Sequence, residues 1–271
     1  MVRVRVFSDF CSSETCREIC ERLWPSDSQI EWTSEGPFTH ALLLNQAMPR
    51  LFLPPANVIG LALEPPQFLL WKESQVTYMK HTAGKYCIGS PGHTSPFVCH
   101  HGFLWHIAPK DPPKTSLMSI MVSAKRFAPG HQYRHDLVSA ILKTSLPIDI
   151  YGRGCPASSD PRIKGHFTES EPYDAYSFHI AIENFQTKAY FSEKVSNPLQ
   201  RRCVPVYLGA EVLPFESSVI RLTGSVETDM KLLSDICATP DLYRRPIDPE
   251  SISSALDLRK FLKQEWNLIQ S

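Results

Sequence analysis

The stretch from residue 176 to residue 209 constrains the fold more than any other part of this sequence. Phe178–Ile182 is an apolar run of the length of a buried strand, and Cys203–Leu208 is a second such run. Between them, Ser192 can cap a helix that has Glu193 in its first turn. A strand, a helix and a strand within about 30 residues fit one βαβ unit with parallel strands.

Polar side chains follow the first of these strands and open the helix. They are Glu183, Asn184, Tyr190, Glu193 and Lys194. Ligands of a βαβ unit bind beyond the carboxyl ends of its strands, and a helix N-terminus with an adjacent lysine favours a phosphate. The sequence therefore predicts a phosphate-bearing ligand held between polar side chains.

Strand and helix patterns alternate along both halves of the chain, which indicates the α/β class. We expect strands at 2–7, 39–45, 57–63, 117–123 and 147–151, and helices at 13–23, 131–144, 226–237 and 250–268. The region 72–115 reads as short strands and loops. Because Pro109–Lys114 is the best linker candidate, we predict domains at 1–112 and 113–271, with a terminal helix that can cross back to the first domain.

Composition excludes several classes of protein. The 271 residues include 28 basic and 28 acidic side chains and no long basic block, which argues against a nucleic-acid partner. The eight cysteines form no C-x-x-C pair, so free thiols in a reducing cytosol are favoured over a disulfide framework. The run Cys99-His100-His101 with His106 matches no structural zinc pattern.

The sequence indicates no membrane segment. The residues Met1–Phe7 alternate like a strand and lack the apolar core of a signal peptide. The most apolar region, 51–71, is interrupted by four prolines and cannot span a bilayer as a helix. We therefore expect a soluble, cytoplasmic protein without a membrane span.

Four residues outside the βαβ unit are further site candidates. Arg134, near the start of a helix, can bind a diphosphate bidentately, although an isolated arginine there is more often a surface residue. Tyr151 begins a Tyr-Gly-Arg-Gly loop that fails as a dinucleotide fingerprint because no helix follows, yet it can wall a base or ribose. Glu64, at a strand end beside apolar residues, is a candidate general base, and Asp9 is the runner-up.

The same positions carry a family resemblance. The pattern Tyr176-x-Phe178, Glu183-Asn184, Tyr190-x-x-Glu193-Lys194 and then Val204-Pro205-Val206 resembles the donor-binding signature of the α1,3-fucosyltransferases, glycosyltransferase family 10. A weaker match upstream includes Val122-Ser123, Arg134 and Tyr151-Gly152. The resemblance covers roughly 115–215.

The resemblance implies the GT-B arrangement, in which two Rossmann-like α/β domains face each other across a cleft. It implies inverting transfer of fucose from GDP-fucose to a glycan hydroxyl. The first domain would bind the acceptor and supply the base, Glu64 or Asp9. In the second domain Arg134 and Lys194 would contact the diphosphate, and Glu193 a hydroxyl of the ribose or sugar.

The chain contains no Asp-x-Asp, the motif with which many sugar transferases of the other major fold hold a cation. We therefore expect a metal-independent enzyme without a tightly bound cofactor. Because animal members of the family are typically anchored in the Golgi by a transmembrane segment, this chain looks more like the soluble viral or bacterial type, or a soluble part of a longer protein.

Two departures from the family pattern leave the donor open. Phe185 follows Glu-Asn where the family usually has a small residue, and Gln200–Cys203 replaces a segment that usually contains Ala-Gly. A UDP-pentose such as UDP-xylose is the alternative donor. An alternative of another class is a non-catalytic module that binds nucleotides or carbohydrates.

Overall fold

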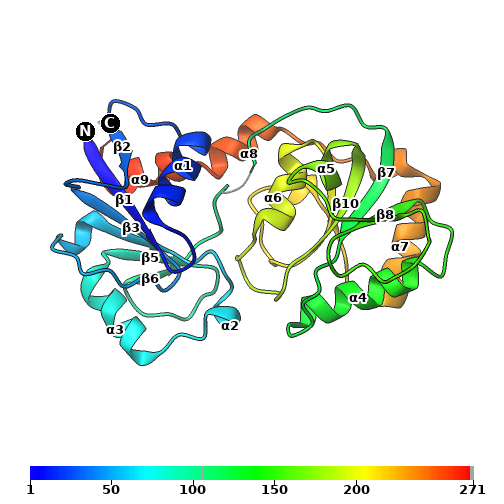
Figure 1. Cartoon of the computed structure of the whole chain (residues 1–271), viewed down its shortest axis with the longest axis horizontal. Helices are drawn as coiled ribbons and strands as arrows, with labels where there is room; N and C mark the ends of the chain where they lie inside the picture. Colours follow the sequence, from blue (N-terminus) through cyan, green and yellow to red (C-terminus); the bar gives the residue numbers. More distant parts are fainter. Residues whose placement is uncertain (105–106, 269–271) are drawn as a thin grey trace. The chain divides into compact units, whose positions relative to one another are not determined.

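The computed structural model describes residues 1–104 and 107–268. The chain forms two compact units (Figure 1). The first contains Met1–Ala108, Thr187–Ser192 and Ser254–Ser271, and the second contains Pro109–Gln186 and Glu193–Ser253. The division falls at Pro109, near the predicted boundary at 113, but two later segments return to the first unit.

The first unit is built on a parallel sheet, which has six strands in the described part of the chain. The strands, in spatial order, are β2 (Ile30–Thr33), β1 (Val2–Ser8), β3 (His40–Leu44), β4 (Val58–Leu61), β5 (Lys85–Ile88) and β6 (Phe97–Cys99). The helices are α1 (Ser13–Leu23), α2 (Pro66–Leu69), α3 (Glu73–Thr82) and α9 (Leu258–Glu265), with the 3-10 turn η1 (Pro55–Asn57). Strands with both faces covered are buried throughout, as β4 is, and this explains their continuous apolar runs.

The terminal helix α9 is tied to the first unit by ion pairs. Lys263 and Arg259 both pair with Asp27, and Glu265 pairs with Lys85. Although partial burial works against the charge, the hydrogen bond from Lys263 lowers the pKa of Asp27 to about 2. The C-terminal segment therefore belongs to the unit that the N-terminus opens.

The second unit also holds a parallel sheet of six strands, counted over the described residues. Its spatial order is β12 (Ile220–Arg221), β11 (Val204–Leu208), β10 (Tyr176–Ile182), β7 (Ser116–Met121), β8 (Ile148–Tyr151) and β9 (Ile163–Gly165). The helices are α4 (Pro129–Ile141), α5 (Glu171–Asp174), α6 (Glu193–Gln200), α7 (Val226–Ala238) and α8 (Pro249–Ala255), with η2 (Glu216–Ser218) and η3 (Pro240–Tyr243).

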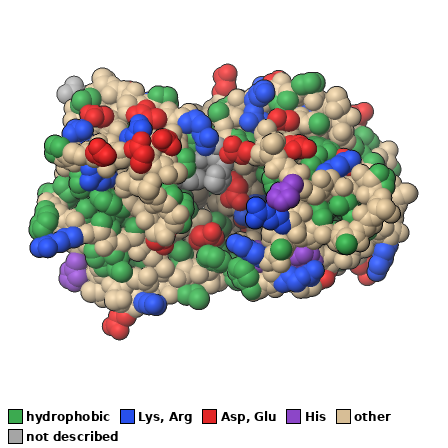
Figure 2. Space-filling view, viewed as in Figure 1, with side chains coloured by type: hydrophobic (Ala, Val, Ile, Leu, Met, Phe, Trp, Pro, Cys, Tyr) green, Lys and Arg blue, Asp and Glu red, His purple; other side chains and the backbone are tan. Residues whose placement is uncertain are grey.

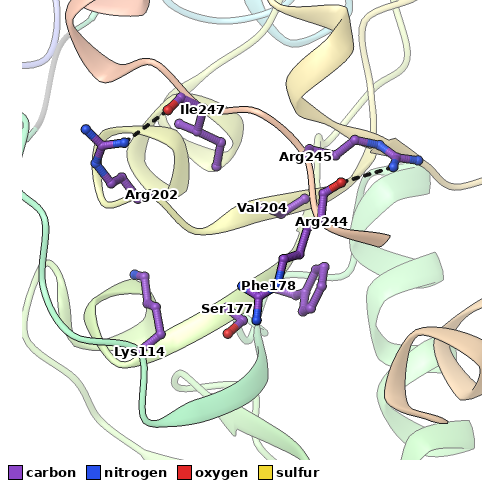
Figure 3. Close-up of a pocket in the computed structure, with 8 residues that line it drawn as sticks. All are labelled: Lys114, Ser177, Phe178, Arg202, Val204, Arg244, Arg245 and Ile247. Atoms are coloured by element: carbon purple, nitrogen blue, oxygen red, sulfur yellow. Dashed lines mark hydrogen bonds between the residues drawn. The ribbon is translucent and has the colours of Figure 1, made fainter. Parts of the chain in front are cut away.

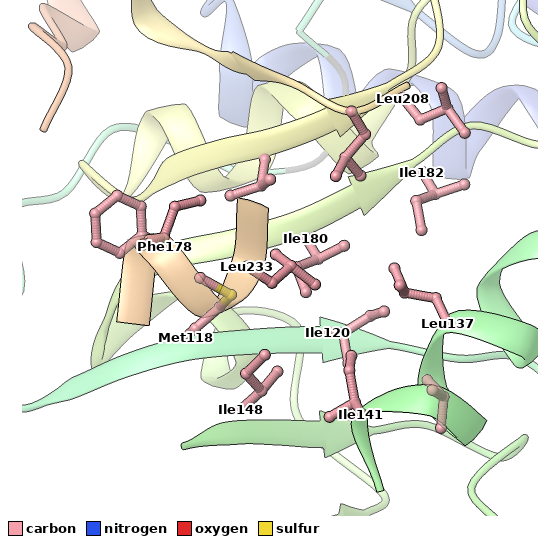
Figure 4. Packing of buried hydrophobic residues seen from close by; sticks show 14 of the residues in the cluster. Met118, Ile120, Leu137, Ile141, Ile148, Phe178, Ile180, Ile182, Leu208 and Leu233 are labelled. Carbon is pink, nitrogen blue, oxygen red and sulfur yellow. The ribbon is translucent and has the colours of Figure 1, made fainter. Parts of the chain in front are cut away.

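Alternating residues of β10 pack on different helices. Phe178, Ile180 and Ile182 face the core that α4 and α7 close, and Figure 4 shows Leu137 and Leu233 directed at this layer. On the opposite face His179 meets Tyr173 of α5. The α/β class with two parallel-sheet domains is thus confirmed.

Two predicted elements were wrong. The region 72–115 contains the helix α3, which the sequence did not predict because only Met79 of its residues is buried and no apolar stripe appears. The single helix expected at 250–268 is two helices, α8 and α9, since Asp257 lies in an extended conformation and caps α9 by accepting from Lys260 N at 2.9 Å.

No helix among residues 1–104 and 107–268 combines the length and the apolar character needed to cross a bilayer.

Candidate functional site

The candidate donor site lies at the carboxyl edge of the second sheet. The chain proceeds from β7 to β8 and β9 on one side and then crosses to β10, β11 and β12 on the other. The strand order therefore reverses between β7 and β10. In open α/β sheets this switch point is where ligands bind, beyond the strand ends.

The N-terminus of α4 is packed directly against the end of β10. Gly130 N donates to Asn184 O at 3.0 Å, and a Cβ on Gly130 would lie 1.8 Å from Glu183 O. Only glycine permits this approach. The partial positive charge of the helix N-terminus is thereby placed at the switch point.

Arg134 projects from α4 into the same region. Its side chain is buried, and Nη2 donates to the carbonyl oxygen of Ile182, the last residue of β10. Burial lowers the pKa of Arg134, and Glu183 and Glu193 work in the opposite direction. The guanidinium stays charged because its pKa begins so high, and it therefore gives this edge a buried cation.

Lys194, Glu193 and Glu183 form an ion-pair cluster. Lys194 Nζ lies 2.9 Å from Glu193 Oε1 and 3.8 Å from Glu183 Oε2. Burial opposes the charge of Lys194, but the two carboxylates outweigh it and raise its pKa. The lysine is therefore a cation with part of its charge already balanced by protein carboxylates.

The positive charge at this edge of the sheet affects the pKa of His131. Burial, together with the neighbouring cations Arg134, Lys125 and Lys194, lowers the pKa of His131 to about 4. His131 accepts from Ala128 N through Nδ1 at 3.2 Å. Figure 2 shows basic and histidine side chains gathered on the α4 side of the second unit.

Three buried polar atoms at this edge or on α4 have no hydrogen-bond partner among the described residues. They are Ser123 Oγ, beyond β7, Asn184 Oδ1, beyond β10, and His135 Nε2. A buried polar group left unsatisfied costs roughly 1–3 kcal/mol. Unpaired polar atoms at two adjacent strand ends are expected where a polar ligand binds.

Tyr151 lies at the end of β8. Its hydroxyl is 2.8 Å from that of Tyr176, which in turn donates to Asp149 Oδ2 at 2.8 Å. The following loop packs on the end of β7, because a Cβ on Gly152 would lie 2.2 Å from Val122 O at φ 111°. Tyr151 therefore has its hydroxyl engaged within the protein, and only its ring remains to wall a ligand.

Tyr190 is built into the first unit and not into the second. Its hydroxyl donates to Leu63 O at 2.9 Å, and its backbone N donates to Gly89 O at 3.1 Å. The expectation that Tyr190 shares one unit with Glu183, Asn184, Glu193 and Lys194 was therefore wrong. The long-range bond to Leu63 and the burial of the ring account for its position.

The acid candidates lie at the carboxyl edge of the first sheet. Asp9 follows β1, is exposed, and accepts from Gln46 N at 3.2 Å. Glu64 follows β4, is half-buried, and comes directly after Leu63, whose N donates to Asn45 Oδ1 at 2.8 Å. Since β3 separates β1 from β4, both acids belong to one edge of this sheet.

No three His, Cys, Asp or Glu side chains of the described chain are grouped as metal ligands. His100 stacks on Phe103 with ring centroids 5.0 Å apart, and its Nδ1 lies 2.6 Å from His101 O. These histidines pack within the first unit, whereas His106 lies outside the described residues.

Sequence reasoning missed His131, His135 and Lys125. The two histidines are spaced i, i+4 around Arg134 on α4, so they share a helix face. That spacing is the one signal from which they could have been found. Nothing in the pattern indicated that this face would meet the ligand edge.

Comparison with known proteins shows what this chain resembles. Residues 111–223 match the model of glycosyltransferase family 10 (fucosyltransferase), C-terminal part. A putative fucosyltransferase-like protein of Arabidopsis thaliana is 30% identical over 124 residues, which cover 44% of this chain and 23% of that protein. The α-(1,3)-fucosyltransferase C of Drosophila melanogaster is 31% identical over 115 residues, covering 41% and 27%. The matches thus span about a quarter of the length of these relatives.

Solved structures extend the likeness to the whole fold. A crystal structure of an α1,3-fucosyltransferase with GDP matches with a TM-score of 0.54 and 11% identity, covering 89% of this chain and 79% of that one. A structure with GDP-fucose matches with a TM-score of 0.52, covering 98% and 90%. Both are of the GT-B type, and the present chain shares that fold. Residues 111–223 thus resemble the C-terminal part of glycosyltransferase family 10, and the chain shares the fold of the α1,3-fucosyltransferase structures.

Proposed function

We propose that this chain is an inverting, metal-independent glycosyltransferase that moves a sugar from a nucleoside-diphosphate donor to a hydroxyl of a glycan. GDP-fucose is the proposed donor, since related structures carry GDP and GDP-fucose. The single observation that carries the proposal is the buried cationic edge of the second sheet. It combines Arg134, Lys194 and the N-terminus of α4 with two unpaired polar atoms.

Arg134 and Lys194 are the proposed diphosphate contacts. A guanidinium and an ammonium at a helix N-terminus can neutralise a diphosphate without a divalent cation. Lys194 is ion-paired with Glu193 and Glu183. When the donor is bound, its ammonium would therefore contact both a carboxylate and a phosphate. Glu193, which is half-buried, would then accept from a ribose or sugar hydroxyl.

The acceptor and the base are assigned to the first unit. Glu64 is the proposed base because it is half-buried, whereas Asp9 is exposed and better solvated. The carboxylate would take the proton of the acceptor hydroxyl as its oxygen attacks the anomeric carbon. The bond from that carbon to the diphosphate then breaks on the opposite face, and GDP leaves with charge stabilised by Arg134 and Lys194.

The position of the segment Gln200–Cys203 weakens one of the two arguments for a UDP-pentose donor. The unusual segment Gln200–Cys203 precedes β11, so it lies at the amino edge of the sheet, opposite the candidate donor site. Phe185 remains, half-buried and next to Asn184. UDP-xylose is therefore the second donor to test rather than an equal candidate.

The test is release of nucleoside diphosphate from GDP-fucose and from UDP-xylose over a panel of glycan acceptors, with and without EDTA. We expect acceptor-dependent release of GDP that EDTA leaves unchanged, and an inverted anomeric configuration in the product by NMR. Donor binding without turnover on any acceptor would instead favour a non-catalytic module. Loss of nucleotide binding with EDTA would contradict the metal-independent account.

A further inference from the structure

A second candidate site lies at the opposite, amino edge of the second sheet. A cavity of about 160 Å³ opens there (Figure 3). Its lining residues are Lys114, Ser177, Phe178, Arg202, Val204, Arg244, Arg245 and Ile247. Phe178 lies near the start of β10 and Val204 begins β11, and the other ends of these strands lead to the candidate donor site.

The cavity is rich in cationic side chains. Arg244 donates from Nε to Asp241 Oδ1 at 2.8 Å, and its Nη groups have no acceptor among the described residues. Figure 3 shows the Arg244 guanidinium directed towards Ser177, with Lys114 across the cavity. Arg202 donates from Nη1 to Ile247 O at 3.2 Å. Arg244 thus brings a guanidinium close to a hydroxyl, and Arg202 and Arg245 add two further basic residues to the lining.

The local carboxylates do not cancel this charge. Asp241 pairs with Arg244 but its side chain is 82% exposed, and Asp111, which pairs with Arg202 Nε at 3.1 Å, is 70% exposed. Such solvated pairs contribute little and yield easily to a stronger partner. Lys114 Nζ donates to three backbone carbonyls, so it adds positive charge to the cavity wall while its own donors are occupied.

The backbone at Arg202 is set by the end of α6. Arg202 has φ +51°, in the left-handed region that glycine adopts most readily. A large side chain is uncommon there and carries a conformational cost. The conformation is that of the residue that ends a helix: Arg202 N donates to Leu199 O at 3.1 Å and Cys203 N to Pro198 O at 2.9 Å, so the end of α6 places Arg202 beside the cavity.

We propose that this cavity binds a phosphate group, either as inorganic phosphate or as part of a small phosphomonoester. A planar guanidinium matches a tetrahedral oxyanion bidentately, and the Ser177 hydroxyl beside the Arg244 guanidinium supplies a further donor. Phe178 and Val204 offer an apolar floor for the organic part of an ester. Because Phe178 and Glu183 are five residues apart on one strand, the cavity lies roughly 17 Å from the donor edge.

The proposal does not rest on the proposed transferase activity. Phosphate could also bind at Arg134 and Lys194, so the test must separate the two sites. Calorimetric titrations of the whole chain with inorganic phosphate and with glucose 6-phosphate, each with and without excess GDP, make that separation. The matched variants are Arg244→Gln, which removes the charge but keeps a polar side chain, and Arg202→Gly, which suits the backbone. Lys231→Gln on the exposed surface of α7 is the control.

We expect saturable binding that persists with GDP present, weakened roughly tenfold by Arg244→Gln or Arg202→Gly and unchanged by Lys231→Gln. Tighter binding of glucose 6-phosphate than of phosphate would identify an ester as the ligand, and the reverse would identify the free ion. Binding abolished by GDP, or weakened by Lys194→Ala and not by Arg244→Gln, would place the phosphate at the donor edge and overturn the proposal. No saturable binding of either probe would also overturn it.

Discussion

Lys194 Nζ lies 3.8 Å from Glu183 Oε2, so the first turn of α6 and the residue beyond β10 share an ion pair. The carboxylate of Glu183 is almost fully buried, whereas the lysine keeps a fifth of its side chain exposed. A buried carboxylate next to a cation holds that cation in place. We infer that Glu183 positions Lys194 for a ligand phosphate rather than contacting the ligand itself.

The proposed base can be tested by removing its ability to accept a proton. Glu64→Gln keeps shape and hydrogen bonding, and general base catalysis typically contributes roughly 10²–10⁴-fold. Turnover should therefore fall by about that factor while the donor Kd stays near wild type. Asp9→Asn is the matched control and should leave turnover within a few-fold. The reverse result would make Asp9 the base.

Asp229 should be a stability residue of the second unit. It is fully buried and accepts from Thr223 N, Thr223 Oγ1 and Gly224 N at 2.9 Å each, and also from the Tyr133 hydroxyl. Asp229→Ala leaves these donors unpaired and should lower the free energy of unfolding by about 3 kcal/mol. Denaturant unfolding measures this, and the exposed Glu227→Ala should change stability by less than about 0.5 kcal/mol.

Stability should depend on pH through His179. The residue is buried, its Nδ1 lies 2.8 Å from Ser119 Oγ, and burial lowers its pKa from 6.5 to about 3. Below pH 6.5 this histidine binds a proton in the unfolded chain but stays neutral in the folded chain. The free energy of unfolding therefore decreases as the pH falls below 6.5, and the contribution of His179 is complete above that pH.

Between pH 6.5 and about pH 5 this one group should remove roughly 1.5–2 kcal/mol. Urea unfolding across that range measures the slope. His179→Gln, which cannot ionise, should show a shallower slope whatever its absolute stability. An equal slope in both proteins would show that His179 does not make this contribution.

The sequence predicted the βαβ unit at 176–208 because its signals are local. Apolar runs marked β10 and β11, and the polar residues after β10 marked the ligand edge. The end of β10 could be placed within one residue for the same reason. Glu183, Asn184, Glu193 and Lys194 could therefore be proposed as site candidates from their places after a strand and at a helix start.

What could not be predicted depends on distant contacts. Tyr190 is separated by 127 residues from its partner Leu63, and no local pattern states which sheet a side chain will join. The close packing of Gly130 against Glu183 likewise brings α4 to a strand end about 50 residues later in the sequence. The cavity at the amino edge of the second sheet joins residues 114, 177, 202 and 244, which share no motif.

The central claim is that the carboxyl edge of the second sheet binds a nucleoside diphosphate through Arg134 and Lys194. Calorimetric titration of GDP into the wild type and Lys194→Ala, in EDTA, tests it most directly, with Lys231→Ala as the control for charge. Thermal unfolding of each protein provides the check on folding.

We predict that Lys194→Ala weakens GDP binding by roughly ten- to a hundred-fold, the value of one charge-assisted phosphate contact, with the control unchanged. A folded Lys194→Ala protein that binds GDP with the wild-type Kd would contradict the account.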